Sequence, residues 1–95
     1  MSTGATLVRA AHAARDRGAR RIIACVAHGL FMPDAEKTLA DPAIELIITT
    51  DTVPPFRLPS GPVRDKLAIA SAAPLLAGAI ARLHEDKPLT DLLVF

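Results

Sequence analysis

The sequence predicts an α/β fold in which short parallel strands alternate with helices. Its apolar runs are short, and stretches with helical spacing separate most of them. The composition is 51% hydrophobic but only 3% aromatic, without Trp or Tyr, so Ala, Leu, Ile and Val must build the core. Such residues suit strands that are buried between layers of helices. The 95 residues support one small domain, 1–95.

The first two elements are a helix and a strand. A helix is predicted over Thr6–Arg17, because Ala and aliphatic residues recur there at helical spacing and Gly18 supplies a stop. The run Ile22–Ala27 is short, apolar and flanked by polar residues, which predicts a strand buried on both faces. Cys25 in this run is the only cysteine, so an internal disulfide is excluded and a buried thiol is expected.

The middle of the chain predicts a short helix, a strand and a loop. The helix is expected over Ala35–Ala40, with Asp34 as its N-cap. The run Ile44–Thr50 is rich in Ile and Thr and predicts a second buried strand. The stretch Pro54–Val63 holds four of the eight prolines and is expected to be a loop.

A third strand and a second long helix complete the pattern. The strand is expected over Lys66–Ala70, and Ser71 would cap a helix over Ala72–Glu85 that carries an apolar stripe. The apolar ending Lys87–Phe95 is expected to dock onto a surface. Parallel strands joined by right-handed crossovers place ligands at their carboxyl ends.

Charge and hydropathy exclude several kinds of protein. Eleven basic and ten acidic residues leave a net charge of +1, which provides no general attraction for nucleic acid or an anionic membrane. The amino end does not resemble a signal peptide, and no apolar run approaches the roughly 20 residues of a membrane span. No Cys/His spacing predicts zinc. We therefore expect a cytoplasmic protein that binds neither nucleic acid nor membrane.

The candidate binding segment precedes the first helix. It consists of Ser2, Thr3, Gly4, Ala5 and Thr6. Small residues of this kind can point several backbone N–H groups into one concavity, where the helix dipole favours an anion. By itself the run also fits an ordinary helix cap.

Two further residues are predicted at the same edge of the sheet. His28 follows the first strand, and it could contact a ligand or bond loop backbone. Asp51 follows the second strand, and it could approach a ligand or a metal, or cap the next turn.

Four motifs occur in an order that resembles the C-terminal half of ribose-phosphate pyrophosphokinases. They are S-T-G-A-T-L from Ser2, A-H-G-L-F from Ala27, D-T-V-P from Asp51 and A-P-L-L-A from Ala73. The resemblance spans nearly the whole chain. Three departures stand out: Ser2 replaces the commoner Asp, Ala27 replaces the usual Thr, and the acidic pair that precedes the loop in the family is missing.

The resemblance implies a three-layer, parallel-sheet, phosphoribosyltransferase-like fold that is truncated at its amino end. It also implies the ribose-phosphate diphosphokinase reaction, in which ATP and ribose 5-phosphate give AMP and 5-phosphoribosyl 1-pyrophosphate. The segment Ser2–Thr6 would hold the 5-phosphate. The ATP site and the ligands of the Mg²⁺ cofactor would lie outside this chain, which would be inactive alone. Family enzymes are homo-oligomers, so a homo-oligomer is expected.

Two alternatives stay open. The missing acidic pair favours a non-catalytic domain that binds a phosphosugar or other subunits. A nucleobase phosphoribosyltransferase would share the phosphate loop, although the D-T-V-P and A-P-L-L-A motifs resemble the pyrophosphokinase instead. The regulated members of the family carry a C-terminal effector segment that Pro88–Leu93 does not match, so effector control is not expected.

Overall fold

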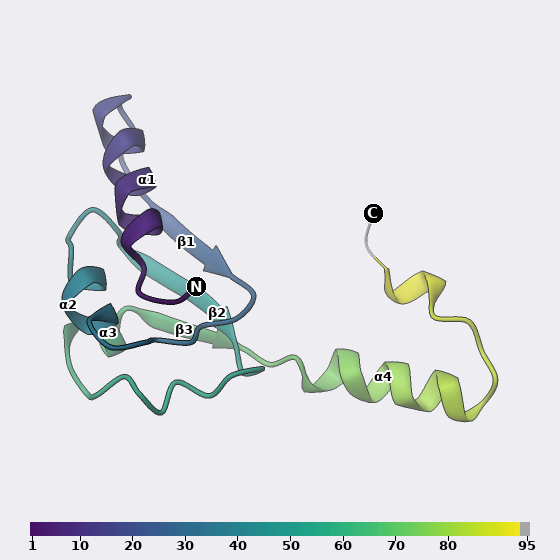
Figure 1. Ribbon diagram of the computed structural model, residues 1–95. Helices are drawn as coiled ribbons and strands as arrows, with labels where there is room; N and C mark the ends of the chain where they lie inside the picture. The colour runs from purple at the N-terminus through teal and green to yellow at the C-terminus, as the bar shows by residue number, and fades with distance from the viewer. Residues whose placement is uncertain (94–95) are drawn as a thin grey trace.

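The computed structural model describes residues 1–93 and confirms the α/β fold with a parallel sheet (Figure 1). Each helix and strand that the sequence predicts is present, with bounds that differ by one or two residues. The elements are α1 (Ala5–Asp16), β1 (Ile23–Val26), α2 (Ala35–Leu39), β2 (Leu46–Thr50), α3 (Pro62–Asp65), β3 (Leu67–Ala70), α4 (Ala73–His84) and a 3₁₀ turn, η1 (Thr90–Leu92).

One part of the predicted loop is a helix. The stretch Pro54–Val63 was expected to be a loop throughout, but its last two residues belong to α3. Pro62 occupies the first turn of that helix, where its fixed φ is suitable and its missing N–H is not needed. The prediction is therefore wrong at Pro62 and Val63.

The three strands are parallel and lie in the order β1-β2-β3. In the register of the sheet, Ala24 lies opposite Ile47, and Ile47 lies opposite Leu67. All three carboxyl ends therefore meet at one edge of the sheet, as the sequence predicts.

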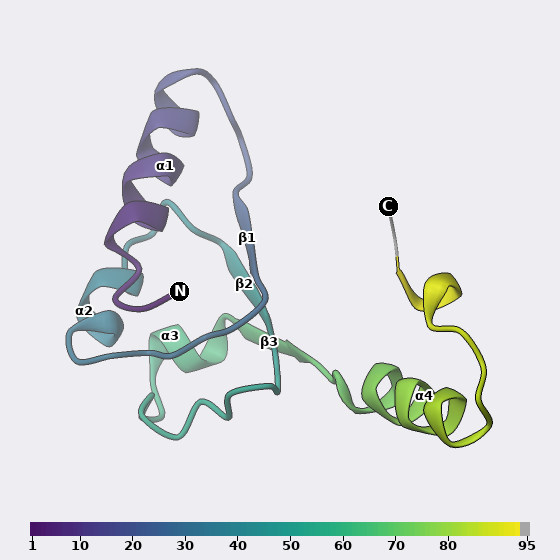
Figure 2. The same cartoon turned by 45° about the vertical axis from the view of Figure 1, so that its right-hand side comes forward.

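The hydrophobic core lies on one face of this sheet. Figure 2 shows α1, α2 and α3 on the same side of the strands. Ala24 and Ile47 face these helices and are buried. The remaining core comes mainly from the helices and from the segments that join them, as its largest fully buried apolar members show: Phe31, Leu39, Ile44 and Val63.

The opposite face of the sheet is not covered by any element among residues 1–93. Ile23 is 47% exposed and Cys25 is also exposed, so the predictions of a β1 buried on both faces and of a buried thiol are wrong. An apolar run predicts that a strand can be buried, but it does not identify the segment that would cover the strand. Helix α4 leaves the end of β3 and extends away from the sheet (Figure 1).

The last residues fold back beside α4. Arg82 Nη1 donates to Asp91 Oδ1 at 2.5 Å and to the carbonyl oxygen of Pro88 at 3.3 Å. Leu93 is nevertheless 54% exposed, so it does not dock onto the sheet domain. Val94 and Phe95 lie outside the described residues. They complete both the predicted docking segment, Lys87–Phe95, and the predicted domain, 1–95.

Candidate anion-binding site

Backbone hydrogen bonds hold the first residues at the carboxyl edge of the sheet. The carbonyl oxygen of Met1 accepts from the N–H of Leu30 at 2.9 Å, and that of Ser2 accepts from the N–H of Met32 at 3.2 Å. The amino group of Met1 donates to the carbonyl oxygen of His28 at 2.7 Å. The segment that the sequence predicts to bind an anion therefore lies beside the turn that follows β1.

Gly4 gives this segment its shape. Its φ of 86° lies in the left-handed region, which glycine adopts most readily. A Cβ at this position would lie 2.4 Å from Cδ2 of Leu39 in α2, which is too close for any side chain. Both the backbone conformation and the close approach of α2 therefore require glycine here.

The amino end of α1 offers unpaired backbone donors. This 12-residue helix has no side-chain cap and no acidic residue in its first turn. Val8 is the first residue whose N–H bonds back, to the carbonyl oxygen of Gly4 at 3.0 Å. Within residues 1–93 the N–H groups of Ala5, Thr6 and Leu7 have no acceptor, and the dipole of α1 favours an anion beside them.

A cavity of about 430 Å³ opens in front of these donors, which is a size that suits a small ligand. It is lined by Met1, Ser2, Thr3, Gly4, Ala5, Thr6, Leu7, Ala10 and Val26. All five predicted loop residues therefore come together in one site. No acidic side chain lines the cavity, and among the described residues the hydroxyls of Ser2, Thr3 and Thr6 have no hydrogen-bond partner.

His28 does not line the cavity, although it lies at the same edge of the sheet. Its Nδ1 lies 2.6 Å from Oγ1 of Thr52, which in turn lies 2.7 Å from Oγ1 of Thr50. Thr50 must donate its proton to the carbonyl oxygen of Ala27, 2.5 Å away, because a carbonyl oxygen only accepts.

The direction of this chain of bonds assigns the proton on His28. Since the proton of Thr50 is used, Thr52 donates to Thr50 or, at 3.4 Å, to the same carbonyl oxygen of Ala27. Either bond uses the proton of Thr52, so His28 Nδ1 must donate to Thr52. Neutral His28 therefore carries its proton on Nδ1 and presents the lone pair of Nε2. Sequence reasoning missed Thr50 and Thr52, because only the register of β1 against β2 brings them to His28.

Both carboxylate oxygens of Asp51 form hydrogen bonds at the start of α4. Its Oδ2 accepts from Oγ of Ser71 at 2.7 Å, and its Oδ1 accepts from the N–H of Ala72 at 2.8 Å. These bonds, the backbone bond first, lower the pKa of Asp51. The prediction that Ser71 is the N-cap of the last long helix is wrong, because α4 begins one residue later and its N-cap is Ala72. Ser71 instead precedes the N-cap and accepts from the N–H of Ala73 at 3.3 Å. Asp51 thus anchors a helix and is not among the residues that line the cavity.

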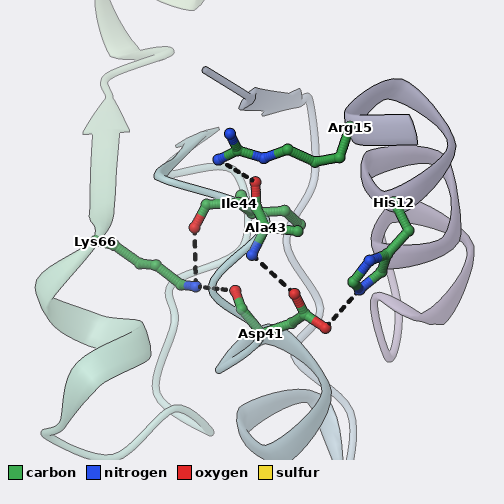
Figure 3. Close-up of polar contacts among 6 residues, drawn as sticks. All are labelled: His12, Arg15, Asp41, Ala43, Ile44 and Lys66. Carbon is green, nitrogen blue, oxygen red and sulfur yellow. Dashed lines mark hydrogen bonds and ion pairs between the residues drawn. The ribbon is translucent and has the colours of Figure 1, made fainter. Parts of the chain in front are cut away.

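A second polar cluster fixes the other end of α1 (Figure 3). Asp41 Oδ2 lies 2.8 Å from Nε2 of His12, and Asp41 Oδ1 accepts from the N–H of Ala43 at 2.8 Å. Lys66 Nζ donates to the carbonyl oxygens of Asp41 and Ile44, at 2.9 and 3.1 Å. The hydrogen bond with His12, followed by that from Ala43, lowers the pKa of Asp41.

The cluster lies at the amino ends of the strands, opposite the anion site. Arg15, on the same helix as His12, donates to the carbonyl oxygen of Ala43 at 3.4 Å (Figure 3). Burial lowers the pKa of Lys66, although the charge of Asp41 opposes that change. The cluster joins α1 to the segment that enters β2, and none of its residues lines the cavity, so we assign His12 a structural role.

Two kinds of feature are absent from the residues that the structure describes. No three His, Cys, Asp or Glu side chains among residues 1–93 come together as a metal site would require. In the same residues, no helix has both the length and the apolar character needed to cross a membrane.

The parallel sheet and its flanking helices define a phosphoribosyltransferase-like α/β domain, and the candidate anion site lies at the carboxyl edge of its sheet. The sequence matches the family described as the phosphoribosyl synthetase-associated domain over residues 2–94, and the chain belongs to this family. Its curated relatives place it at the C-terminal region of ribose-phosphate pyrophosphokinases.

Individual relatives agree with this assignment. The chain is 40% identical over 92 residues to the ribose-phosphate pyrophosphokinase of Caldanaerobacter subterraneus and 37% identical to that of Aquifex aeolicus. Both matches cover 97% of this chain and 28% of the relative. The crystal structure of phosphoribosylpyrophosphate synthetase from Mycobacterium smegmatis matches with a TM-score of 0.78 and 32% identity, over 90% of this chain and 28% of that one. The chain thus spans little more than a quarter of these proteins.

Proposed function

We propose that this chain is the part of a ribose-phosphate diphosphokinase that holds ribose 5-phosphate by its 5-phosphate group. The observation that carries the proposal is the cavity in front of α1, into which the backbone N–H groups of Ala5, Thr6 and Leu7 open without an acceptor. Helix amino ends of this kind bind phosphate. Membership of the pyrophosphokinase family supports ribose 5-phosphate as the phosphate ester that binds there.

In this proposal the chain positions the acceptor sugar. The N–H groups of the first turn and the hydroxyls of Ser2, Thr3 and Thr6 hold the phosphate, which leaves the anomeric hydroxyl free to react. That hydroxyl loses its proton to solvent as its oxygen attacks the β-phosphorus of ATP. The bond from the β-phosphorus to the oxygen that bridges it to the α-phosphorus breaks, so the pyrophosphoryl group is transferred to the sugar and AMP leaves with that oxygen. The remainder of the enzyme would bind ATP and Mg²⁺.

The described residues do not themselves fit Mg²⁺. Among residues 1–93 no three carboxylate, imidazole or thiolate groups converge, so we assign no step through a metal to this chain. We therefore expect the isolated chain to form no 5-phosphoribosyl 1-pyrophosphate from ribose 5-phosphate and MgATP. A rate of formation that rises with the concentration of purified chain would contradict this expectation.

Titration of the ¹⁵N-labelled chain with ribose 5-phosphate tests the binding step directly. We expect saturable amide shifts that are largest from Gly4 to Leu7, because those N–H groups would bond the phosphate. Unphosphorylated ribose should leave the same amides unmoved, and inorganic phosphate should shift them more weakly. Unchanged spectra from a folded chain, or shifts confined to α4, would refute the proposed site.

Paired substitutions locate the site more closely. Thr6→Val removes a hydroxyl that lines the cavity, whereas Thr38→Val removes one in α2 that does not. We expect Thr6→Val to weaken ribose 5-phosphate binding by about tenfold or more, in line with the loss of one hydrogen bond to a charged group. Thr38→Val should leave the affinity unchanged, and equal effects of the two substitutions would contradict the assignment.

A non-catalytic phosphosugar-binding or subunit-interaction domain is the second candidate. The lack of a convergent carboxylate set in residues 1–93 favours it for the chain taken alone. The two candidates differ when the chain is joined to the part of a pyrophosphokinase that precedes the matched region. Formation of 5-phosphoribosyl 1-pyrophosphate by the joined protein supports the enzyme, and binding without turnover supports the second candidate.

A further inference from the structure

A second cavity lies between the start of α2 and the proline-rich loop that follows β2, and we call it the second cavity. Its volume is about 380 Å³, which is within the range of small-molecule sites. None of the residues that line it lines the cavity in front of α1. It is therefore a separate candidate site.

The floor of the second cavity is apolar. Phe31 and Leu58 line it and are only 2% and 5% exposed, and Met32 also lines it. The apolar group of a ligand can leave water here and gain the free energy of hydrophobic burial. The floor therefore favours a ligand with an aliphatic or aromatic side group.

Three charged side chains line the same cavity, namely those of Asp34, Glu36 and Arg57. They are exposed, and among residues 1–93 none of the three takes part in an ion pair. A dicarboxylate would meet the two carboxylates of the protein, and a diamine would meet the guanidinium group of Arg57. A ligand that carries one positive and one negative group satisfies all three side chains.

Two contacts hold Arg57 in place at the cavity. Its guanidinium carbon lies 4.4 Å from the centre of the Phe56 ring, and its Nη1 donates to the carbonyl oxygen of Leu30 at 3.4 Å. Within residues 1–93 its Nε and Nη2 have no acceptor. A carboxylate can accept from both of these nitrogens at once, in the bidentate geometry that arginine favours.

The segment Leu30–Asp34 joins the second cavity to the candidate anion site, and we call it the bridge segment. The N–H groups of Leu30 and Met32 donate to the carbonyl oxygens of Met1 and Ser2, at 2.9 and 3.2 Å. Met1 and Ser2 line the cavity in front of α1, whereas Met32 lines the second cavity. A ligand in the second cavity therefore contacts the segment that holds the anion-binding residues in place.

The backbone of the bridge segment is strained. The φ angles of Phe31 and Asp34 are 46° and 72°, both in the left-handed region. Aspartate enters this region readily, but a bulky residue such as phenylalanine does so only at a cost in free energy. A ligand that contacts Phe31 and Asp34 together stabilises this conformation, and with it the hydrogen bonds to the anion-binding segment.

We propose that the second cavity binds an α-amino acid with an apolar side chain, as its zwitterion, and that this binding raises the affinity of the chain for a phosphate ester. The ligand's carboxylate accepts from Nε and Nη2 of Arg57, and its ammonium group donates to Asp34 and Glu36. Its side chain packs on Phe31 and Leu58. This site goes beyond the proposed function, and it shares no residue with the C-terminal effector segment of the regulated family members.

Titration of the ¹⁵N-labelled chain with L-leucine tests the site. We expect saturable amide shifts that are largest in the bridge segment, at Glu36 and at Arg57, with a dissociation constant of about 1 mM, which suits a ligand of this size at an open site. Glycine lacks the side chain that the floor buries, so it should bind about tenfold more weakly or less. N-acetyl-L-leucine lacks the ammonium group and L-leucinamide lacks the carboxylate, so each should also bind more weakly by about tenfold or more.

A matched pair of substitutions tests the contact with the carboxylate. Arg57→Met removes the charge at the second cavity, and Arg9→Met does the same at an exposed position of α1 that lines neither cavity. We expect Arg57→Met to weaken L-leucine binding by about tenfold or more, and Arg9→Met to leave it unchanged. Glu36→Gln should narrow the difference in affinity between L-leucine and N-acetyl-L-leucine by about twofold to fivefold, since only L-leucine carries the ammonium group.

The coupling is measured by titrating the chain with ribose 5-phosphate in the presence and absence of saturating L-leucine. We expect L-leucine to lower the dissociation constant of ribose 5-phosphate by about fivefold. Ribose 5-phosphate should raise the affinity for L-leucine by the same factor, because coupling between two binding sites is reciprocal. In the Arg57→Met chain the same concentration of L-leucine should leave ribose 5-phosphate binding unchanged.

The two parts of the proposal can fail separately. A folded chain without shifts in the bridge segment, equal binding of L-leucinamide and L-leucine, or tighter binding of putrescine than of L-leucine would each overturn the amino-acid site. L-leucine binding that leaves the affinity for ribose 5-phosphate unchanged would overturn the coupling. L-leucine binding by a chain that does not bind ribose 5-phosphate would refute the proposed function and the coupling, and would support the amino-acid site.

Discussion

Gly4 is the residue on which the shape of the anion site depends most directly. Any side chain at this position meets Leu39 and must also adopt a left-handed φ. Gly4→Ala is therefore expected to lower the free energy of unfolding by about 1–3 kcal/mol, through backbone strain and displacement of α2. It should also abolish the amide shifts caused by ribose 5-phosphate. Urea denaturation and the same NMR titration measure the two effects.

Gly78 supplies the control for that substitution. It lies in α4, and a Cβ there would meet no atom within 4 Å. Gly78→Ala is expected to raise the free energy of unfolding by up to about 1 kcal/mol, because alanine favours the helix and fills open space. Equal destabilisation by both substitutions would show that space and φ at Gly4 are not the cause.

The hydrogen-bond chain from His28 to Ala27 makes a prediction about a single proton. In the neutral form, ¹H–¹⁵N correlation spectra of the imidazole should show the proton of His28 on Nδ1, because Thr52 can only accept there. Thr52→Val removes the acceptor and should return His28 to the mixture of tautomers found in solution. His84 serves as the internal reference in the same spectra. A proton found on Nε2 in the unmodified chain would contradict the derived bond directions.

At the scale of the elements, Asp41 joins α1 to the segment that enters β2. A carboxyl whose pKa is lower in the folded chain than in the unfolded chain stabilises the fold above its unfolded pKa, near 3.8, and that contribution is lost as the pH falls through the lower folded value. Asp51 and Glu45 also have lowered pKa values, through Ala72 and Arg21 respectively, so they add to the acid sensitivity.

Asp41→Asn should therefore reduce, and not remove, the loss of stability in acid. We expect the melting temperature of the variant to be lower than that of the unmodified chain at neutral pH, and the difference to shrink towards about pH 3. Asp16→Asn removes the same charge from α1 without touching this cluster and serves as the control. A constant difference between the Asp41 variant and the unmodified chain at every pH would contradict the role of the His12–Asp41 pair.

The sequence predicted the elements better than their surroundings. Helical spacing identified α1 and α4, and short apolar runs identified the three strands, because these signals depend on neighbouring residues. Burial on both faces of β1 and burial of Cys25 were predicted wrongly, since no element among residues 1–93 covers that face of the sheet. Pro62 was assigned to a loop because proline ends most helices, whereas here it begins one.

Part of the candidate site could also be predicted from the sequence, and part could not. The segment Ser2–Thr6 was predicted as one unit, and it forms one cavity because its residues are consecutive. The bond between His28 and Thr52 could not be predicted, because it depends on the pairing of two strands that are distant in the sequence. The hydrogen bond of Asp51 to the start of α4 could not be predicted either, because it depends on the position in space at which β3 ends and α4 begins.

For the whole molecule, the extended position of α4 determines the size in solution. The dimensions are 49 × 31 × 18 Å, with a radius of gyration of 16.3 Å. Small-angle X-ray scattering of the isolated chain is expected to give a value near 16 Å, because α4 extends away from the sheet (Figure 1). A value near the roughly 12 Å of a compact chain would show that α4 folds onto the face of its own sheet that α1, α2 and α3 do not cover.

The backbone bonds between the first two residues and the turn after β1 also govern the order of folding. Met1 and His28 are 27 positions apart, so the binding segment is fixed only when the intervening chain has closed into a loop, whereas α1 can form from local contacts alone. Helical signal should thus return early in refolding, and affinity for a phosphate ester should return late, together with exchange protection of the amides of Leu30 and Met32. The candidate anion site is in this sense a product of tertiary assembly, although all of the residues that line its cavity except Val26 lie at the start of the sequence, from Met1 to Ala10.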